Sequence, residues 1–398
     1  MRARIVLVKS AAAVIAFSIL LMVAPSLHRA AAQEAPPGAP NVAGSWVLID
    51  TDTGLQLAGK DPDKQVSIAS TTKIMVALVA LDEGVDLDEK VTVSEDAAAY
   101  AGSFYSNVGL YPYDQVSVED LLTAALVPSG TDAVYALAEH LGDGSVDEFV
   151  GKMNDKAKEL GLKNTHYENP AGIDDPKNYS SAGDLARMTR EAMKNPEFRE
   201  IVATPEAVIS TQDREIQIVN TNLLVVPNSG YDYGPATGIK TGTSLQAGPC
   251  LVASATSGDE SYIAVVLDAA GDFQRFDATT TLLEYGFGEF ENEPLVKQGD
   301  EFANLELPYR RGESVKLVAA RNVTALAGPG LEVERQAAHE EAPPTAKKGQ
   351  ELGTVEVSVE GRDAGSSPLI AQQGYQAASL WQKITYWAGG LKRWVLQR

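Results

Sequence analysis

Residues 61–84 read DPDKQVSIASTTKIMVALVALDEG and place a serine and a lysine at the start of an apolar segment. Ser70 and Lys73 are three positions apart, and no polar residue follows them before Asp82. This pattern predicts a buried helix that begins near Ser70 and ends at Gly84. Positions i and i+3 share one face of a helix, so we expect the hydroxyl and the amine within hydrogen-bonding reach.

A serine hydroxyl becomes an effective nucleophile only when a neighbouring base removes its proton. A lysine can be that base where its surroundings stabilise the neutral amine. An N-cap serine beside a surface lysine is the commoner explanation of an isolated Ser-x-x-Lys, so this tetrapeptide alone does not decide the function.

Two further motifs follow in the chain. Ser129-Gly130-Thr131 lies 59 residues after Ser70, in a turn between two predicted helices, and Lys240-Thr241-Gly242 lies 111 residues after Ser129 on a predicted strand. A hydroxyl in a turn can relay a proton, and a lysine on an edge strand can hold a carboxylate. Each motif alone fits an ordinary turn or strand end. The three in this order, on these element types, favour a serine hydrolase site.

At these residues the chain resembles penicillin-binding proteins and serine β-lactamases, whose signature is Ser-x-x-Lys, Ser-x-Asn and Lys-Thr-Gly. Residues 161–172, 179–184 and 220–224 are in addition similar to D-Ala-D-Ala carboxypeptidases of the penicillin-binding protein 5 type. The likeness is strong over about residues 45–290, weak after them and clear again in the last twenty. It implies an α+β fold of the DD-peptidase/β-lactamase type, an antiparallel sheet with helices.

The resemblance also implies a role for each motif residue. Lys73 would deprotonate Ser70, which attacks the carbonyl of the penultimate D-Ala of a peptidoglycan stem peptide, and Ser129 would protonate the departing D-Ala. The terminal carboxylate would be bound by Lys240, Thr241 and Thr243, while Gly242 lets the substrate approach the strand. The N–H groups of Ser70 and Thr243 would form the oxyanion hole. Water would hydrolyse the acyl-enzyme, a β-lactam would acylate the same serine, and no metal or organic cofactor is implied.

The second motif departs from the family pattern, because Thr131 stands where the family has asparagine. A threonine hydroxyl lacks the reach and the second functional group of the amide. We therefore expect Thr131 to contribute to substrate binding. We also expect the reaction to be slower, or its substrate range to differ, compared with family members that have asparagine.

Charge and composition exclude some functions. The chain has 33 basic and 54 acidic residues, a net charge of −21, and four of the basic residues but none of the acidic ones lie in residues 1–32. Such an acidic protein is not expected to bind nucleic acid. Its single cysteine, Cys250, excludes an internal disulfide and is expected to be a small buried residue, while four histidines leave little scope for a metal cluster.

The first 32 residues have the pattern of a secretory signal peptide. Basic residues precede an apolar run from Ala11 to Ala24, and Ala30-Ala31-Ala32 offers a cleavage site. This pattern predicts an exported protein at the outer face of the cytoplasmic membrane. Residues 33–44 would be a linker to the first domain. The alternative is an uncleaved N-terminal anchor.

The rest of the chain divides into three predicted parts. Residues 45–291 would form the catalytic domain, with strands at both ends and helices between them, the last helix spanning 279–285 and stopping at Gly286. Residues 292–374 show short alternating strands at 315–319, 331–335 and 355–359, which indicates a small β domain with a polar excursion at 336–349.

Residues 377–398 are predicted to form an amphipathic helix. They contain three of the four tryptophans, four basic residues and no acidic one. This composition favours an interfacial helix on an anionic membrane over a helix packed on the β domain. The apolar stripe comprises Leu380, Trp381, Ile384, Trp387, Ala388, Leu391, Trp394 and Val395.

Other functions remain open at this stage. The nearest is a class A-type β-lactamase, which needs a carboxylate to activate the deacylating water; Glu168 is a superficial candidate. Small endopeptidases are also compatible with the motif spacing. A non-catalytic envelope protein that binds stem peptides is favoured only by Thr131. A Ser-His-Asp hydrolase would have to use His140 or His166, and no Gly-x-Ser-x-Gly motif accompanies them.

Overall fold

The computed structural model describes residues 43–396, without the side chains of residues 389–396. The predicted signal peptide, most of the predicted linker and residues 397–398 lie outside the described residues.

The first sheet joins strands from both ends of the first 270 residues. It comprises β1 (Ala43–Asp50), β2 (Gln56–Lys60), β7 (Ala236–Ser244), β8 (Gly248–Ser257) and β9 (Glu260–Ala269), all antiparallel in the order β2-β1-β9-β8-β7. The strands predicted at both ends of the catalytic domain are thus present. β7 forms one edge of the sheet, which leaves its outer side free for another element.

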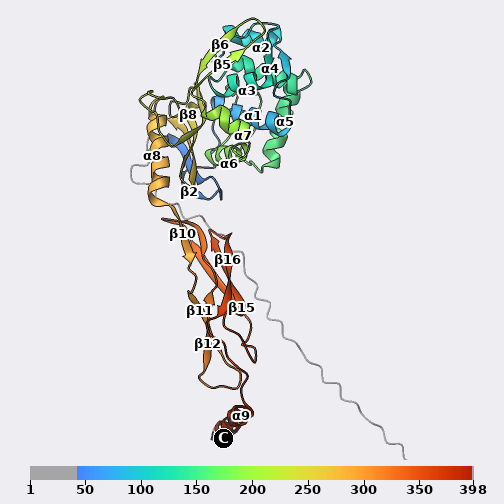
Figure 1. Ribbon diagram of the computed structural model, residues 1–398. Helices are drawn as coiled ribbons and strands as arrows, with labels where there is room; N and C mark the ends of the chain where they lie inside the picture. Colours follow the sequence, from blue (N-terminus) through green and yellow to red (C-terminus); the bar gives the residue numbers. More distant parts are fainter. Residues whose placement is uncertain (1–42, 397–398) are drawn as a thin grey trace, which may run out of the picture. The chain divides into compact units, whose positions relative to one another are not determined.

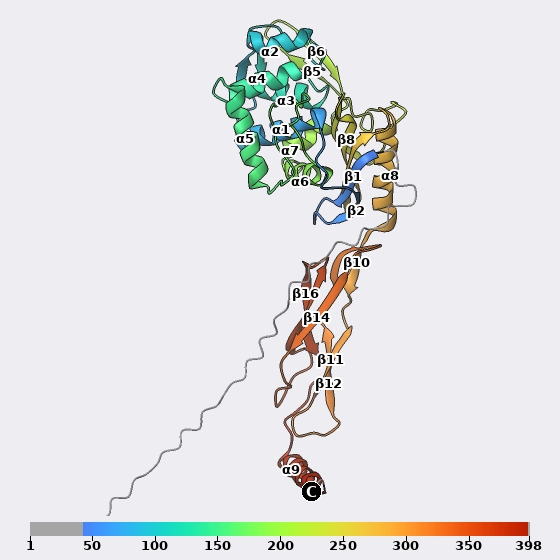
Figure 2. The same ribbon diagram turned by 180° about the vertical axis from the view of Figure 1, so that it is seen from behind.

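Side chains alternate between the two faces of this sheet along each strand. Each face carries buried apolar side chains, and helices cover both faces. On β9, Ile263 and Val265 face the larger group of helices, whereas Tyr262, Ala264 and Val266 face the opposite side, where α8 (Gln274–Glu289) packs (Figures 1 and 2). Burial of each large apolar side chain stabilises the fold by roughly 1.5–3 kcal/mol.

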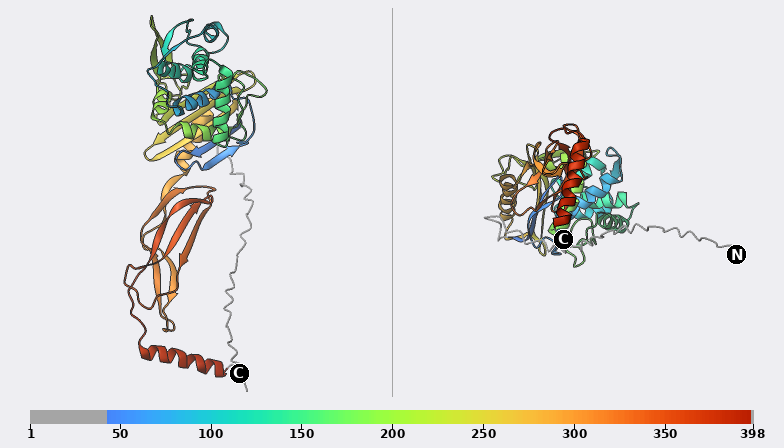
Figure 3. Two further views of the ribbon diagram at one scale, coloured as in Figure 1. Left: turned by 90° about the vertical axis from the view of Figure 1, so that its right-hand side faces the viewer. Right: turned by 90° about the horizontal axis from the view of Figure 1, so that it is seen from below.

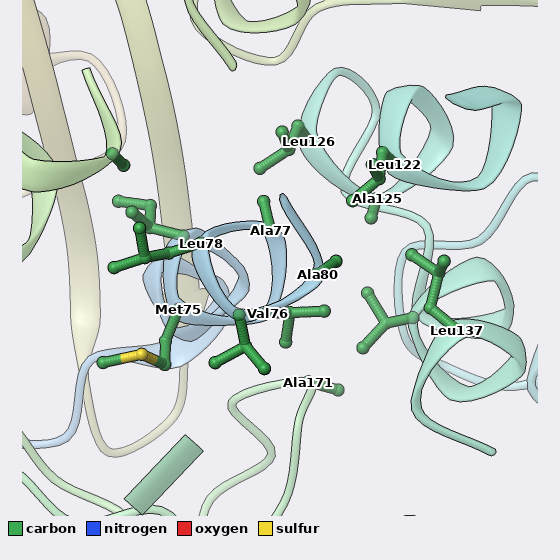
Figure 4. Packing of buried hydrophobic residues seen from close by; sticks show 14 of the residues in the cluster. Met75, Val76, Ala77, Leu78, Ala80, Leu122, Ala125, Leu126, Leu137 and Ala171 are labelled. Atoms are coloured by element: carbon green, nitrogen blue, oxygen red, sulfur yellow. The ribbon is translucent and has the colours of Figure 1, made fainter. Parts of the chain in front are cut away.

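The central helix, α1 (Lys73–Asp82), follows a single 3₁₀ turn, η1 (Ala69–Thr72). Its side chains from Lys73 to Ala80 are all buried, which its continuous apolar sequence requires. Figure 4 shows Met75, Val76 and Leu78 packed in a shell of apolar side chains from other elements. The helix ends as predicted: the N–H of Gly84, at φ +67°, donates to the carbonyl of Leu81.

Further helices surround α1. The N–H of Asp120 donates to the Ser117 hydroxyl, so Ser117 is the N-cap of α3. The sequence patterns did not predict α2, α5, α7 or the small hairpins. The elements are α2 (Glu95–Ala99), η2 (Tyr100–Gly102), α3 (Val118–Leu126), α4 (Thr131–Leu141), α5 (Val146–Glu159), α6 (Ala182–Ala192), α7 (Pro196–Ala203), β3 (Lys90–Thr92), β4 (Gln115–Ser117), β5 (Glu206–Ser210) and β6 (Glu215–Val219).

The helix predicted at 279–285 is longer than expected. α8 begins at Gln274 and continues through Gly286 to Glu289. Gly286 does not end the helix; a Cβ at this position would lie only 2.9 Å from Cδ2 of Tyr262. The glycine therefore permits close packing of α8 on the ring of Tyr262, and this function leaves no signal in the sequence alone.

The residues that follow are β-rich. β11, β12, β14, β15 and β16 form one twisted antiparallel sheet in the order β11-β12-β16-β15-β14 (Figure 3), and β10 pairs with β13. The excursion predicted at 336–349 begins later than expected, because β14 extends to His339; this exposed edge strand has no apolar alternation to reveal it. The strands are β10 (Glu291–Val296), β11 (Glu301–Glu306), β12 (Ser314–Ala319), β13 (Val323–Ala327), β14 (Val333–His339), β15 (Glu351–Val359) and β16 (Arg362–Ala371).

The last element, α9 (Leu380–Leu396), is one continuous helix (Figure 3) that begins three residues later than the predicted segment. Leu380, Trp381, Ile384 and Trp387 are between 51% and 79% exposed, so the described part of the predicted apolar stripe faces solvent. None of the helices in residues 43–396 combines the length and the apolar character that a membrane crossing requires.

Candidate active site

The nucleophile candidate lies where η1 meets α1. Ser70 is in η1, and Lys73 is the first residue of α1, so one turn separates the hydroxyl from the amine. Lys73 Nζ lies 2.9 Å from Ser70 Oγ. The spacing in the sequence therefore gives the contact that the helix geometry predicted.

Burial changes the proton affinity of this lysine. The Lys73 side chain is only 1% exposed, and loss of solvation lowers its pKa to about 7. The negative charge of Asp132 acts in the opposite direction and limits the shift. At neutral pH a large fraction of this amine is therefore unprotonated and able to accept the proton of Ser70.

The second motif is held in the turn between α3 and α4. Ser129 has φ +72°, a left-handed conformation that is uncommon for residues other than glycine, and its Oγ lies 3.3 Å from Lys73 Nζ. Thr131 begins α4, and its Oγ1 lies 3.5 Å from the same nitrogen. Lys73 thus faces three hydroxyl groups, of which that of Thr131 is the most distant.

Asp132, which the sequence analysis did not single out, supports this turn. Its buried carboxylate accepts hydrogen bonds from the backbone N–H groups of Val108, Leu110 and Ala133, at 3.0–3.2 Å. The charge-assisted bonds from Val108 and Leu110 hold the 108–110 loop against the catalytic turn. Only its position directly after the second motif could have indicated Asp132.

The third motif lies on β7, at the edge of the sheet. Lys240 is 1% exposed, and its Nζ has no hydrogen-bond partner among the residues that the structure describes. Burial, followed by the positive charges of Lys73 and Arg275, lowers its pKa. A buried amine without a partner is unfavourable until an anion binds to it. The site thus has a built-in affinity for a carboxylate.

Gly242 lies in a close contact between β7 and η1. A Cβ on it would lie 2.9 Å from the carbonyl oxygen of Ile68 and 3.2 Å from the N atoms of Ser70 and Thr71. The missing side chain lets β7 pack directly on the turn that carries the nucleophile.

Arg275 is a second residue that sequence reasoning missed. It projects from α8 and is 9% exposed; its Nη1 donates to the carbonyl of Gly242 at 3.1 Å and to Thr243 Oγ1 at 2.8 Å. The Thr243 hydroxyl in turn lies 3.4 Å from a carboxylate oxygen of Asp272. The guanidinium therefore adds positive charge at the end of β7. No sequence motif marks Arg275.

The 169–178 segment packs against the residues that directly precede Ser70. Gly172 has φ +77°, and a Cβ on it would lie 1.8 Å from the carbonyl oxygen of Ala69. Asp174 accepts hydrogen bonds from the hydroxyls of Ser67 and Ser244 at 3.1 Å and 2.5 Å. One carboxylate thus joins the chain before η1 to the end of β7.

The residues of the rival hypotheses lie in other contacts. The carboxylate of Glu168 is 3.8 Å from His166 Nδ1 and from Lys177 Nζ at the surface. His140 faces Glu89 at 3.5 Å. Cys250 is a buried free thiol, as predicted, and burial raises its pKa to about 12. In residues 43–396 no three His, Cys, Asp or Glu side chains are grouped so that they could hold a metal ion.

The geometry is that of a hydrolase acting on an anionic acyl compound. The amine of a buried lysine of lowered pKa lies within hydrogen-bonding distance of two serine hydroxyls, beside a strand whose lysine has no hydrogen-bond partner among the described residues. Such a group can form and cleave an acyl-enzyme without an external base.

Comparison with known proteins agrees with this chemistry. The family model described as D-alanyl-D-alanine carboxypeptidase matches residues 30–271, and the model described as penicillin-binding protein 5, C-terminal domain, matches residues 290–377. The D-alanyl-D-alanine carboxypeptidase DacF of Bacillus subtilis is 35% identical over 84% of this chain and 86% of its own length. The D-alanyl-D-alanine carboxypeptidase DacC of Escherichia coli is also 35% identical, over 92% of both chains.

Solved structures show the same likeness. The Streptomyces K15 DD-transpeptidase is 37% identical, with a TM-score of 0.58 over 62% of this chain and 97% of its own. The D-alanyl-D-alanine carboxypeptidase DacD of Francisella tularensis, 24% identical, shares the fold with a TM-score of 0.65 over 86% of this chain and 96% of its own. The expected α+β fold, followed by a small β domain, is thereby confirmed.

Proposed function

Because the chain belongs to the D-alanyl-D-alanine carboxypeptidase family, we propose that it removes the terminal D-Ala from peptidoglycan stem peptides through an acyl-enzyme on Ser70. The observation that carries this proposal is the 2.9 Å contact between Ser70 Oγ and a buried Lys73 with a pKa lowered to about 7. This contact supplies both the nucleophile and the base.

In the acylation step, neutral Lys73 takes the proton of Ser70 while Oγ attacks the carbonyl carbon of the penultimate D-Ala. The C–N bond to the terminal D-Ala then breaks, and its nitrogen needs a proton. Ser129 Oγ, 3.3 Å from Lys73 Nζ, passes that proton from the new ammonium group to the leaving amine. Lys73 is neutral again and can activate the water that hydrolyses the ester.

The terminal carboxylate is bound at β7. Protonated Lys240 and the hydroxyls of Thr241 and Thr243 face it, and Arg275 adds charge behind Thr243. Binding of an anion raises the pKa of Lys240 towards its usual range, because an adjacent negative charge favours the ammonium form. The backbone N–H groups of Ser70 and Thr243 stabilise the oxyanion. A β-lactam, whose carboxylate occupies the same position, acylates Ser70.

The test of this proposal is release of free D-Ala from diacetyl-L-Lys-D-Ala-D-Ala by the purified protein. The wild type should release one D-Ala per peptide, and Ser70→Ala should release none. Ser257→Ala, which removes an exposed hydroxyl at the end of β8, is the matched serine-to-alanine control and should retain activity. Absence of release by a folded wild type, or release by Ser70→Ala, would reject the proposal.

We propose further that residues 1–32 are a signal peptide, 33–44 a linker, 45–291 the catalytic domain, 292–374 a β domain and 377–398 an anchor at the outer face of the cytoplasmic membrane. The apolar run and the Ala-Ala-Ala site support export, and the ranges of the two family models support the division. The exposed tryptophans of α9, next to basic residues, support attachment to anionic lipid.

Removal of residues 377–398 tests the anchor. The truncated protein should cleave the small peptide at the wild-type rate and should no longer sediment with phosphatidylglycerol-containing vesicles. Trp381→Gln with Trp387→Gln is a milder variant that should weaken sedimentation in part. Sedimentation unchanged by the truncation would contradict the anchor without affecting the proposed activity.

A further inference from the structure

Thr221, between β6 and β7, contacts both the turn that precedes α4 and strand β7. Its backbone N–H donates to the carbonyl of Val127 at 3.1 Å, two residues before Ser129. Its hydroxyl lies 3.3 Å from the same carbonyl and 2.6 Å from the hydroxyl of Thr241. A single residue thus links the turn that carries Ser129 to the strand that carries the carboxylate-binding groups.

The segment around Thr221 is fixed by its neighbours. The side-chain amide of Asn220 donates to the carbonyl of Thr204 at 2.9 Å, and its oxygen accepts from the N–H of Asn222 at 2.8 Å. The oxygen of Asn222 accepts from the N–H of Leu224 at 3.2 Å. Both asparagines are buried, so the position of Thr221 does not depend on its own hydroxyl.

The direction of each hydroxyl proton follows from the partners. A carbonyl only accepts, so Thr221 must donate to Val127 when that bond is made, and it then has no proton left for Thr241. Thr241 therefore donates to Thr221 in the free protein. A bound carboxylate also only accepts, so Thr241 has to turn its proton to the carboxylate. Thr221 can then turn its proton to Thr241, because its N–H still satisfies Val127.

We propose that Thr221 is a positioning residue of the carboxylate subsite: its hydroxyl reverses direction when an anion binds and makes Thr241 a better donor. This inference rests on the proposed function, since it requires a substrate carboxylate at Thr241. Hydrogen bonds in series polarise one another, so donation from Thr221 strengthens the bond from Thr241 to the anion. Thr221 acts through Thr241 and does not itself touch the substrate.

A double-mutant cycle tests the proposal. The probe is benzylpenicillin, whose carboxylate stands in for that of the peptide, and the readout is the second-order rate constant for adduct formation by intact mass. Thr221→Val, which keeps the shape and the N–H, should lower this constant about tenfold. Thr221→Ser, which keeps the hydroxyl, should stay within about threefold of wild type. In a Thr241→Val background, Thr221→Val should change the constant by less than about twofold.

Two results would overturn the inference: an unchanged rate constant for Thr221→Val, or equal losses in the two backgrounds, which indicate a merely structural effect. Thermal unfolding of each variant checks the fold, and Thr221→Ala is the second hydroxyl-free variant if valine disturbs packing. Failure of the proposed function would look different, since the wild type itself would then form no adduct on Ser70.

Discussion

Replacing Thr131 with asparagine is the most informative change to the second motif. Thr131 Oγ1 lies 3.5 Å from Lys73 Nζ, at the outer limit of a hydrogen bond, whereas the hydroxyls of Ser70 and Ser129 lie at 2.9 Å and 3.3 Å. Asparagine carries its oxygen one bond farther from the backbone, and its amide adds a donor for the substrate.

The magnitude follows from this geometry. One additional hydrogen bond to a charged or buried group is worth roughly 1.5–3 kcal/mol, or about ten- to a hundredfold in rate if the bond acts only in the transition state. We therefore expect Thr131→Asn to preserve kcat/KM for the diacetyl peptide or to raise it, up to that range. Thr131→Val, which removes only the long contact, should lose no more than about fivefold.

The assay is D-Ala release under steady-state conditions, with thermal unfolding as the check on the fold. If Thr131→Asn abolishes activity while the unfolding temperature is unchanged, the site is built around threonine and the reasoning is refuted. A large loss in Thr131→Val would equally contradict the weak contact that the 3.5 Å distance indicates.

Three other predictions follow from the site. Acylation by benzylpenicillin should accelerate about tenfold between pH 6 and pH 8, because Lys73, with its pKa lowered to about 7, must lose its proton to act as base; a rate that falls over this range would exclude that role. Gly172→Ala should destabilise the fold by about 3 kcal/mol or more, since its Cβ would lie 1.8 Å from the Ala69 carbonyl oxygen. The control Gly161→Ala, at φ +66° with open space around it, should cost about 1 kcal/mol. Equal unfolding temperatures of the two variants would refute the close contact at Gly172. The penicilloyl-enzyme should deacylate slowly because Glu168 is engaged at the surface, and rapid turnover of a chromogenic cephalosporin would favour the β-lactamase alternative.

The sequence predicted the parts of the site that follow from local spacing. Ser70 and Lys73 meet because one helical turn separates them, and the strand predicted for Lys240-Thr241-Gly242 is part of β7 in the sheet. Asp132, Thr221 and Arg275 were missed because their roles arise from contacts between segments that are distant in the chain. No periodicity or motif encodes such contacts.

The difference between local patterns and long-range contacts also explains which helix and strand boundaries were predicted wrongly. Elements with a long apolar run and a glycine stop, such as α1, were predicted well. Gly286 was taken for a helix end because its packing partner, Tyr262, lies on a strand 24 residues earlier. β14 was cut short because an exposed edge strand needs no apolar alternation, so only its first three residues, 333–335, were predicted as strand and the rest as loop.

The central claim, that Ser70 is the acylated nucleophile, is tested most directly by mass spectrometry after brief treatment with benzylpenicillin. The intact wild-type protein should gain one penicilloyl group, peptide mapping should locate it on Ser70, and Ser70→Ala should gain none. An adduct that persists on Ser70→Ala, or one that maps to Ser129 in the wild type, would contradict the claim.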